Sequence, residues 1–148
     1  MLSELKNRAV EADKAFSSFD EIFSDWYGIL SSSESLSPLL SLDISSESKQ
    51  LLSSLVDTAS VLDKTYKELE LKRDEIVLEY ALALVGGKLG DIIDYVDHTG
   101  KNCSLVIESA FMYGTDVSIY GTRFLKSGHI GKTQGSVYLG NMSWALRK

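Results

Sequence analysis

Two long patterns of apolar residues constrain the fold of this chain more than any other feature. In the first 30 residues, apolar side chains recur at spacings of three and four, as in helices that pack side by side in a coiled coil or bundle. The first set comprises Leu2, Leu5, Ala9, Ala12, Phe16, Phe19, Phe23, Trp26 and Leu30. The second set comprises Leu52, Leu55, Ala59, Leu62, Tyr66, Leu69, Arg73, Ile76, Tyr80 and Ala83, with Arg73 as its one polar member. We therefore predict two long helices that form a helical hairpin or coiled-coil bundle over residues 1–87.

Local signals set the expected bounds of these helices. The first is predicted from Ser3 to about Leu30, and the second from about Ser46 to Val85, where Gly86-Gly87 is a typical helix terminator. A serine-rich connector between them is expected to dock on the helices or on a neighbour, with a helical turn at Pro38–Leu42. At the standard rise per residue the second helix spans about 60 Å and the first about 42 Å. One helix is therefore too short to cover the other.

The side chains on these stripes favour association of more than two helices. Phe16, Phe19, Phe23 and Trp26 are too bulky for a tight two-stranded seam and suit a bundle of three or more helices, or a seam that another domain covers. Residues 76–85 are apolar on nearly all sides, so they must be buried under the C-terminal part of the chain or in an oligomer axis. Whether helices pair in parallel between chains or antiparallel within one chain stays open at this stage.

The C-terminal part, residues 88–148, is predicted to combine a short helix with a small β-meander. The apolar residues of Lys88–His98 share one helical face, which predicts a short amphipathic helix. From Cys103 onward the period changes to two, which indicates strands. We expect a three-stranded antiparallel meander with a glycine-rich loop over Lys126–Gly135 and a bulge or close approach at Gly121. The fold class is therefore α+β, and the open sheet edges also favour self-association. The alternative is a monomer whose helical hairpin folds back over its own sheet.

Composition restricts the possible environments. The 148 residues are 44% hydrophobic and 24% charged, as in ordinary globular proteins. The single Cys103 excludes an intramolecular disulfide and is expected to be a buried, inert thiol. The start of the chain lacks the pattern of a cleavable signal peptide, and no stretch of 18 apolar residues predicts a membrane span. We therefore expect a cytoplasmic or virion protein without a membrane partner.

Charge is distributed unevenly along the chain. Residues 1–85 carry 16 acids and 8 bases, whereas residues 86–148 carry 5 acids and 7 bases. The bases at the C-terminal end are scattered and lack the density of a phosphate-neutralising patch, so nucleic acid is not an expected partner. The acidic helices and the basic C-terminal part are suited to attract each other between subunits, or the basic part is suited to meet an anionic partner.

No motif in the chain indicates catalysis, a cofactor or a metal. The segment GHIGKTQG (128–135) lacks the glycine spacing of a phosphate-binding P-loop, so it is interpreted as a hairpin loop. His129 and Lys132 within this segment, together with Lys126 just before it, remain a candidate partner-contact loop. Asp91, Asp94, Asp97 and His98 are interpreted as a solvated helix face rather than a metal site, because an EF-hand pattern is missing.

Two charged residues within the second helix are candidates for special roles. Arg73 lies in the apolar stripe, where a charge must be paired and is able to fix the register and the oligomeric state. Its expected partners are Glu70, Asp74 or an acid from a second helix. Glu79 lies in the apolar run before Tyr80, and we expect it to reach solvent or to pair with a base.

These patterns favour a non-enzymatic structural or assembly protein. It is expected to form a homo-oligomer through its helices and to present the β part to a protein partner. A helical stalk followed by a small glycine-rich β tip resembles the layout of viral and bacteriophage assembly parts, such as fibre, adaptor or cement proteins. The alternatives are a small acidic binding or inhibitory protein that occupies a partner surface, and an enzyme or ligand-binding domain that uses the loop with His129 and Lys132.

Overall fold

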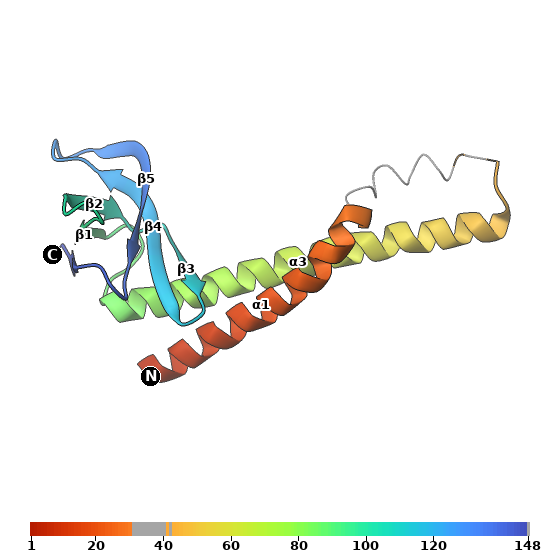
Figure 1. Cartoon of the computed structure of the whole chain (residues 1–148), viewed down its shortest axis with the longest axis horizontal. Helices are drawn as coiled ribbons and strands as arrows, with labels where there is room; N and C mark the ends of the chain where they lie inside the picture. The colour runs from red at the N-terminus through yellow and green to blue at the C-terminus, as the bar shows by residue number, and fades with distance from the viewer. Residues whose placement is uncertain (31–40, 42, 148) are drawn as a thin grey trace. The chain divides into compact units, whose positions relative to one another are not determined.

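The protein has an α+β fold in which two long helices precede a curled antiparallel sheet of six strands (Figure 1). This computed structural model describes residues 1–30, 41 and 43–147, without the side chains of residues 25–30. The helical turn predicted at Pro38–Leu42 therefore lies outside the described residues, apart from Ser41. The elements are α1 (Leu2–Leu30), α3 (Ser46–Val85), β1 (Ile92–Val96), β2 (Asn102–Val106), β3 (Ser109–Tyr113), β4 (Asp116–Phe124), β5 (Ile130–Tyr138) and β6 (Trp144–Leu146).

The ends of α3 are stabilised by local hydrogen bonds. Ser45 is the N-cap, because its hydroxyl oxygen accepts the backbone N–H of Ser48 at 3.1 Å. At the other end Gly86 has a φ of 68°, and the N–H of Gly87 donates to the carbonyl of Leu82 at 3.1 Å. This is the Schellman arrangement that satisfies orphan carbonyls at a helix C-terminus. The glycine pair therefore ends the helix as the sequence predicted.

The described chain packs as two compact units. The first, which we call the β unit, combines Met1–Asp13 with Lys72–Lys148, and so contains the whole sheet. The second, the helical unit, comprises Lys14–Leu71. The helical region expected over residues 1–87 therefore contributes to both units, since α1 and α3 each supply residues to both.

The sheet is curled, and the pairing of β4 is irregular on both of its sides: its register with β5 shifts between Thr122 and Phe124, and a bulge lies opposite Tyr120. Both β2 and β3 pair with β4, and β1 and β6 follow beyond β2, while β5 pairs with the other side of β4. Glu108 and Ser109 both oppose Tyr120: the N–H of Glu108 donates to the carbonyl of Tyr120 at 3.0 Å, and Ser109 is its register partner. Two residues opposite one make a β-bulge, which bends the strand and increases its twist. Strands β2 and β3 are thus two halves of one bent strand.

The helix predicted over Lys88–His98 is wrong, because this segment contains strand β1. Its apolar residues fit a helical face, but Ile93 and Tyr95 also alternate with polar or half-buried neighbours. Strand β1 pairs with β2 on one side and with β6 on the other. These long-range hydrogen bonds, which a local pattern does not reveal, decide the conformation.

The meander of three strands is also corrected to a sheet of six. The apolar alternation after Cys103 is divided between β2 and β3, and the predicted last strand is divided between β5 and β6. Most of the expected loop over Lys126–Gly135 belongs to β5, which is rich in polar residues and glycine and in which only Val137 is fully buried. The alternation of apolar residues, on which the prediction depended, is weak there.

The core of the β unit lies between the sheet and the helices. Figure 1 shows the last turns of α3 running beside the strands, and the N-terminal turns of α1 lie next to them. The fully buried side chains from the sheet include Ile93, Leu105, Ile107, Met112, Ile119 and Val137. From the helices, the same core includes Ala9, Val77, Tyr80, Ala81 and Val85. The apolar end of α3 is therefore buried under the C-terminal sheet, one of the two arrangements that the sequence allowed.

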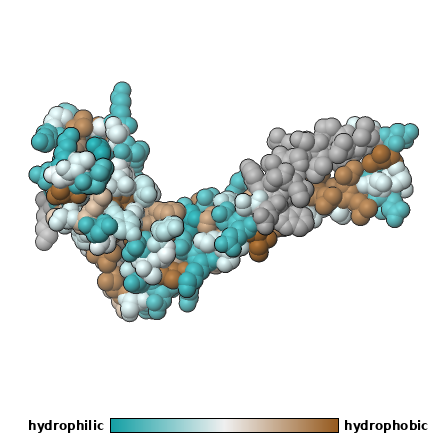
Figure 2. Space-filling view, viewed as in Figure 1, coloured by the Kyte–Doolittle hydropathy of each residue, from teal (hydrophilic) through white to brown (hydrophobic). Residues whose placement is uncertain are grey.

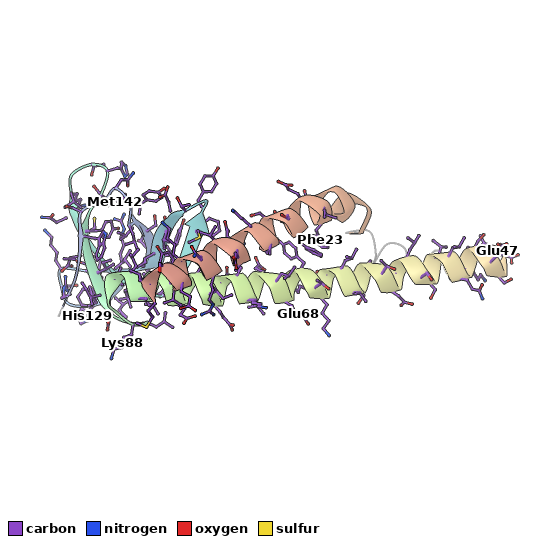
Figure 3. All side chains as sticks on the ribbon, turned by 90° about the horizontal axis from the view of Figure 1, so that it is seen from below. Phe23, Glu47, Glu68, Lys88, His129 and Met142 are labelled. Atoms are coloured by element: carbon purple, nitrogen blue, oxygen red, sulfur yellow. The ribbon has the colours of Figure 1, made fainter. Side chains whose placement is uncertain are left out.

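The helical unit has its own small core between antiparallel segments of α1 and α3. The Phe23 ring lies 4.7 Å from that of Tyr66, and the Phe16 ring lies 5.2 Å from the same tyrosine, between ring centroids. Ala59 is buried in this cluster, with Phe19 and Leu62 packed against it. Figure 3 shows Phe23 on the side of α1 that faces α3. The pairing is antiparallel and within one chain.

Gly121 is required where two strands approach closely. A Cβ atom at this position would lie 1.6 Å from the carbonyl oxygen of Val106, far inside any contact that real Cβ atoms show. Because the neighbour is backbone beside the bulge, it has little freedom to move away. The close approach predicted at this glycine is therefore present.

We predict that Gly121→Ala destabilises the β unit by about 3 kcal/mol or more, since the methyl group forces the two strands apart. Gly140→Ala is the matched control, because its added Cβ would meet its nearest neighbours only at 3.5 Å. The control is expected to change the unfolding free energy by no more than about 0.5 kcal/mol. Urea unfolding followed by circular dichroism measures both. Equal stability of the two variants would contradict the close approach.

A second pair of variants tests the helical core. Phe23 is buried and its neighbour Ile22 is 62% exposed, although both lie in the same turn of α1. Phe23→Ala should cost about 3 kcal/mol of unfolding free energy, whereas Ile22→Ala should stay within about 0.5 kcal/mol. Amide hydrogen exchange in α1 reports the loss locally. A larger effect for Ile22→Ala would show that the opposite face of α1 is the packed one.

Candidate functional site

The residues predicted to form a helix seam differ in their burial. Those that are buried are Phe16, Phe23, Arg73 and Tyr80. Those that are partly buried are Leu5, Phe19, Leu52, Leu62, Tyr66, Leu69 and Ile76. Leu2 and Leu55 are exposed, and the side chain of Trp26 lies outside the described residues. The seam is thus covered along most of its length but open at its ends.

The first turns of α3 carry an uncovered part of this apolar stripe. Leu51 is 65% exposed and Leu55 is 45% exposed, while Leu52 is partly buried. Leu55 lies four residues after Leu51, and Leu62 lies seven residues further on, so the three share the helix face that packs against α1. Figure 2 shows hydrophobic residues over the first turns of α3. We call Leu51, Leu52 and Leu55 the open stripe.

Arg73 is only 9% exposed, and its charge is balanced within the β unit. Its Nε and Nη2 atoms donate to Oδ1 of Asp74 at 2.9 and 2.7 Å, so one of the partners expected from sequence is present. The guanidinium carbon also lies 5.6 Å from the centroid of the Phe111 ring in β3. Burial raises the pKa of the nearby Asp13 carboxyl, and the charge of Arg73 opposes that rise. Arg73 therefore connects α3 to the sheet.

Glu79, the other charged candidate, is exposed and pairs with Arg8 of α1 at 3.6 Å. Both side chains are about half exposed, so this ion pair adds little stability. Cys103 is half-buried rather than fully buried, and its thiol lies 3.6 Å from Oδ2 of Asp97.

The structure separates the three residues of the predicted partner-contact loop. A tight turn joins β4 to β5: the N–H of Leu125 donates to the carbonyl of His129 at 2.9 Å, and Gly128 has a φ of 83°. Lys126 lies in this turn and lines a cleft of the β unit, whereas Lys132 lies on β5 outside that cleft. His129, labelled in Figure 3, is exposed and also lies outside the cleft.

This cleft has a volume of about 770 Å³ and lies over the outer face of strands β1, β2 and β6. Its floor contains Asp94 with its register partners Ser104 and Ala145, on the opposite side of the sheet from the buried Ile93. Its wall comes from the end of β4 and the turn that follows, with Phe124, Leu125, Lys126 and Gly128. The other lining residues are Tyr95, Val96, Asn102, Cys103, Ser143, Trp144 and Arg147. The size is typical of a site for a small ligand.

Arg147 is fixed in the cleft by contacts on several sides. Its Nε atom donates to Oδ2 of Asp94 at 3.1 Å, and its Nη2 atom donates to Oδ1 at 2.5 Å and to the hydroxyl of Ser104 at 3.0 Å. The guanidinium carbon lies 5.2 Å from the centroid of the Phe124 ring. The hydrogen bond from Arg147 lowers the pKa of the Asp94 carboxyl. The pair is therefore ionised at neutral pH and holds the guanidinium group in one orientation.

The other acids of the predicted metal-like cluster have separate structural tasks. Oδ2 of Asp91 accepts the N–H of Lys88 at 3.0 Å. Oδ1 of Asp97 accepts the hydroxyl of Thr99 at 2.6 Å and the N–H of Lys101 at 3.0 Å, and these bonds lower the pKa of Asp97. Within the described residues, no group of three His, Cys, Asp or Glu side chains is arranged to hold a metal ion. The expectation of a solvated helix face was wrong in one respect, since the segment is a strand and a turn.

Sequence reasoning missed the cleft. Arg147 and Asp94 lie 53 positions apart in the chain and meet only because β6 pairs with β1. The available signal was the alternation of apolar and polar residues around Asp94, which puts its carboxylate on the face opposite Ile93. That signal was hidden because the segment also fits a helix.

The Asp94–Arg147 pair predicts a small, pH-dependent stability difference. The pKa of the Asp94 carboxyl is lowered in the folded protein. The stability that the ionised carboxylate contributes is therefore present above the ordinary pKa of an aspartate and is lost as the pH falls through the folded value. Both side chains are about two-fifths exposed, so Asp94→Asn should cost less than about 1 kcal/mol at pH 7. The difference between wild type and variant should shrink in acid. Urea unfolding at pH 7 and below pH 4 measures it.

An Arg147→Gln background provides the control for this prediction. There, Asp94→Asn should have a smaller effect at pH 7, because the partner is already missing. If Asp94→Asn has the same effect in this background as in the wild type, a contact other than Arg147 lowers the pKa of Asp94.

The chain matches no protein-family model, and no curated protein or solved structure is significantly similar to it. In the described part of the chain, neither helix is apolar enough over a sufficient length to cross a membrane. The helix faces and the cleft are therefore the features from which we propose a function.

Proposed function

We propose that this chain is a non-enzymatic assembly protein that associates with copies of itself through the open stripe of α3. The observation that carries the proposal is the exposure of Leu51 and Leu55 on the face of α3 that packs against α1 further along. Large apolar side chains gathered on one helix face are typical of association surfaces. Such a protein presents its β unit to a further protein partner.

A second copy of the chain is the partner that fits the open stripe best. The open stripe continues the heptad spacing of the buried cluster around Ala59 and Leu62, so a further helix with the same spacing is able to extend the same packing. The aromatic side chains of this cluster are of the size found in bundles of several helices. In the β unit, the apolar faces of the helix segments already pack against the sheet. This unit therefore offers no similar helix face to a second copy.

The negative charge of the helical unit opposes this association. Residues 14–71 carry ten acids and four bases, and the rest of the chain carries eleven of each, so the whole net charge of −6 belongs to the helical unit. Like charges on two copies repel, and salt screens that repulsion. We therefore expect self-association to strengthen as the salt concentration rises.

The same charge favours one alternative, a small acidic protein that binds and inhibits a basic partner. An acidic surface is suited to occupy a basic groove on a target. That binding weakens with salt, opposite to the expected trend for self-association. Among assembly proteins, the proposal includes the fibre, adaptor and cement proteins of virions, which the layout resembles.

The proposal predicts that the double variant Leu51→Glu, Leu55→Glu is monomeric at concentrations where the wild type is oligomeric. The added carboxylates would have to be buried without partners at the interface. Leu71→Glu is the matched control: Leu71 is 64% exposed, but it lies nine residues after Leu62, on the opposite face of α3. Light scattering coupled to size-exclusion chromatography measures the mass of each. A monomeric wild type at high salt, or dissociation by Leu71→Glu alone, would contradict the proposal.

A further inference from the structure

The cleft of the β unit has features of a ligand site that the proposed self-association does not use. We infer that it binds a carboxylate group attached to an apolar body, either a free small acid or the C-terminal end of a peptide. The inference depends on the charge of the cleft, on the way Arg147 is held, and on the apolar character of part of its wall. It is independent of the oligomeric state, because every lining residue named belongs to the β unit.

The charges of the cleft favour an anion. Among the described residues that line it, two are basic, Lys126 and Arg147, and one is acidic, Asp94. Lys126 is exposed, and it forms no ion pair with another described residue. Because Asp94 already neutralises one cation, one positive charge remains to attract an anion. Inorganic phosphate has no apolar body to place against the rest of the wall, whereas an organic carboxylate has one.

Arg147 is oriented before any ligand arrives. Nε and Nη2 are occupied by Asp94 and Ser104, and within the described chain Nη1 has no partner, so its two N–H groups remain to donate. The stack on Phe124 fixes the plane of the guanidinium group. A side chain that is already ordered loses little entropy when it binds, and the N–H groups of Nη1 are able to donate charge-assisted hydrogen bonds to a carboxylate oxygen.

The rest of the wall suits an apolar body. Val96, Leu125, Ala145 and Phe124 line the same cleft. Sites that combine an apolar wall with a few polar groups fix both the position and the orientation of a small ligand.

The test uses 3-phenylpropionate as the probe, with 3-phenylpropionamide as its uncharged match and inorganic phosphate as a second anion. Titration of the ¹⁵N-labelled full chain followed by NMR should shift the signals of Arg147 Nε–H and of Ser104 and Lys126 with the carboxylate. The amide and phosphate should bind at least about fivefold more weakly, the factor that one exposed ion pair contributes. Equal binding of the amide, or tighter binding of phosphate, would overturn the inference.

Two lysine variants distinguish binding in the cleft from general electrostatic attraction to the protein. Lys126→Glu should weaken binding of 3-phenylpropionate by about fivefold or more, whereas Lys132→Glu should leave it unchanged, since Lys132 lies on β5 outside the cleft. Arg147→Lys keeps the charge but loses the donors of Nη1 and the contacts that orient the side chain, and it should also weaken binding. Equal losses in the two lysine variants would overturn the inference.

Two peptides distinguish the sources of the carboxylate. A pentapeptide that ends in a free C-terminal phenylalanine, compared with its C-terminal amide, shows whether a peptide end is accepted. Tighter binding of the free acid peptide than of 3-phenylpropionate would assign the site to peptide ends, and the reverse order would assign it to small acids. Binding of neither acid in the millimolar range would overturn the inference.

Discussion

The apolar face of α3 is the constraint on which the rest of this structure depends. Along one helix it is used in three ways: its last turns are buried against the sheet, its middle packs against the aromatic residues of α1, and its first turns are left open. Burial of a large apolar side chain contributes about 1.5 to 3 kcal/mol. The two covered stretches therefore stabilise the units, and the open one is the surface through which we propose that copies of the chain associate.

Only part of this arrangement was predictable from sequence. The bounds of α1 and α3 follow from local signals, because helix hydrogen bonds and caps such as Ser45 and Gly86 lie within a few residues of each other. The burial of most of residues 76–85 was predictable as well, since a helix end that is apolar on nearly all sides has to be covered, and only Glu79 and Ala83 of this segment are exposed.

The sheet was less predictable because its order is decided by long-range pairing. Strand β1 fits a helix by its apolar spacing, and β5 has little apolar alternation at all. The cleft combines Asp94, Ser104 and Arg147, which come together only once β1 has paired with both β2 and β6. No local pattern contains that information. The close approach at Gly121 was accessible because only glycine fits such a position.

The central claim is that the first turns of α3 are covered by a second copy of the chain. Amide hydrogen exchange of residues 46–58, measured by mass spectrometry over a hundredfold range of protein concentration, tests this most directly. The account predicts that these amides become more protected as concentration rises, while the amides of β1 and β4 do not change. Exchange in α3 that is the same at every concentration would contradict it.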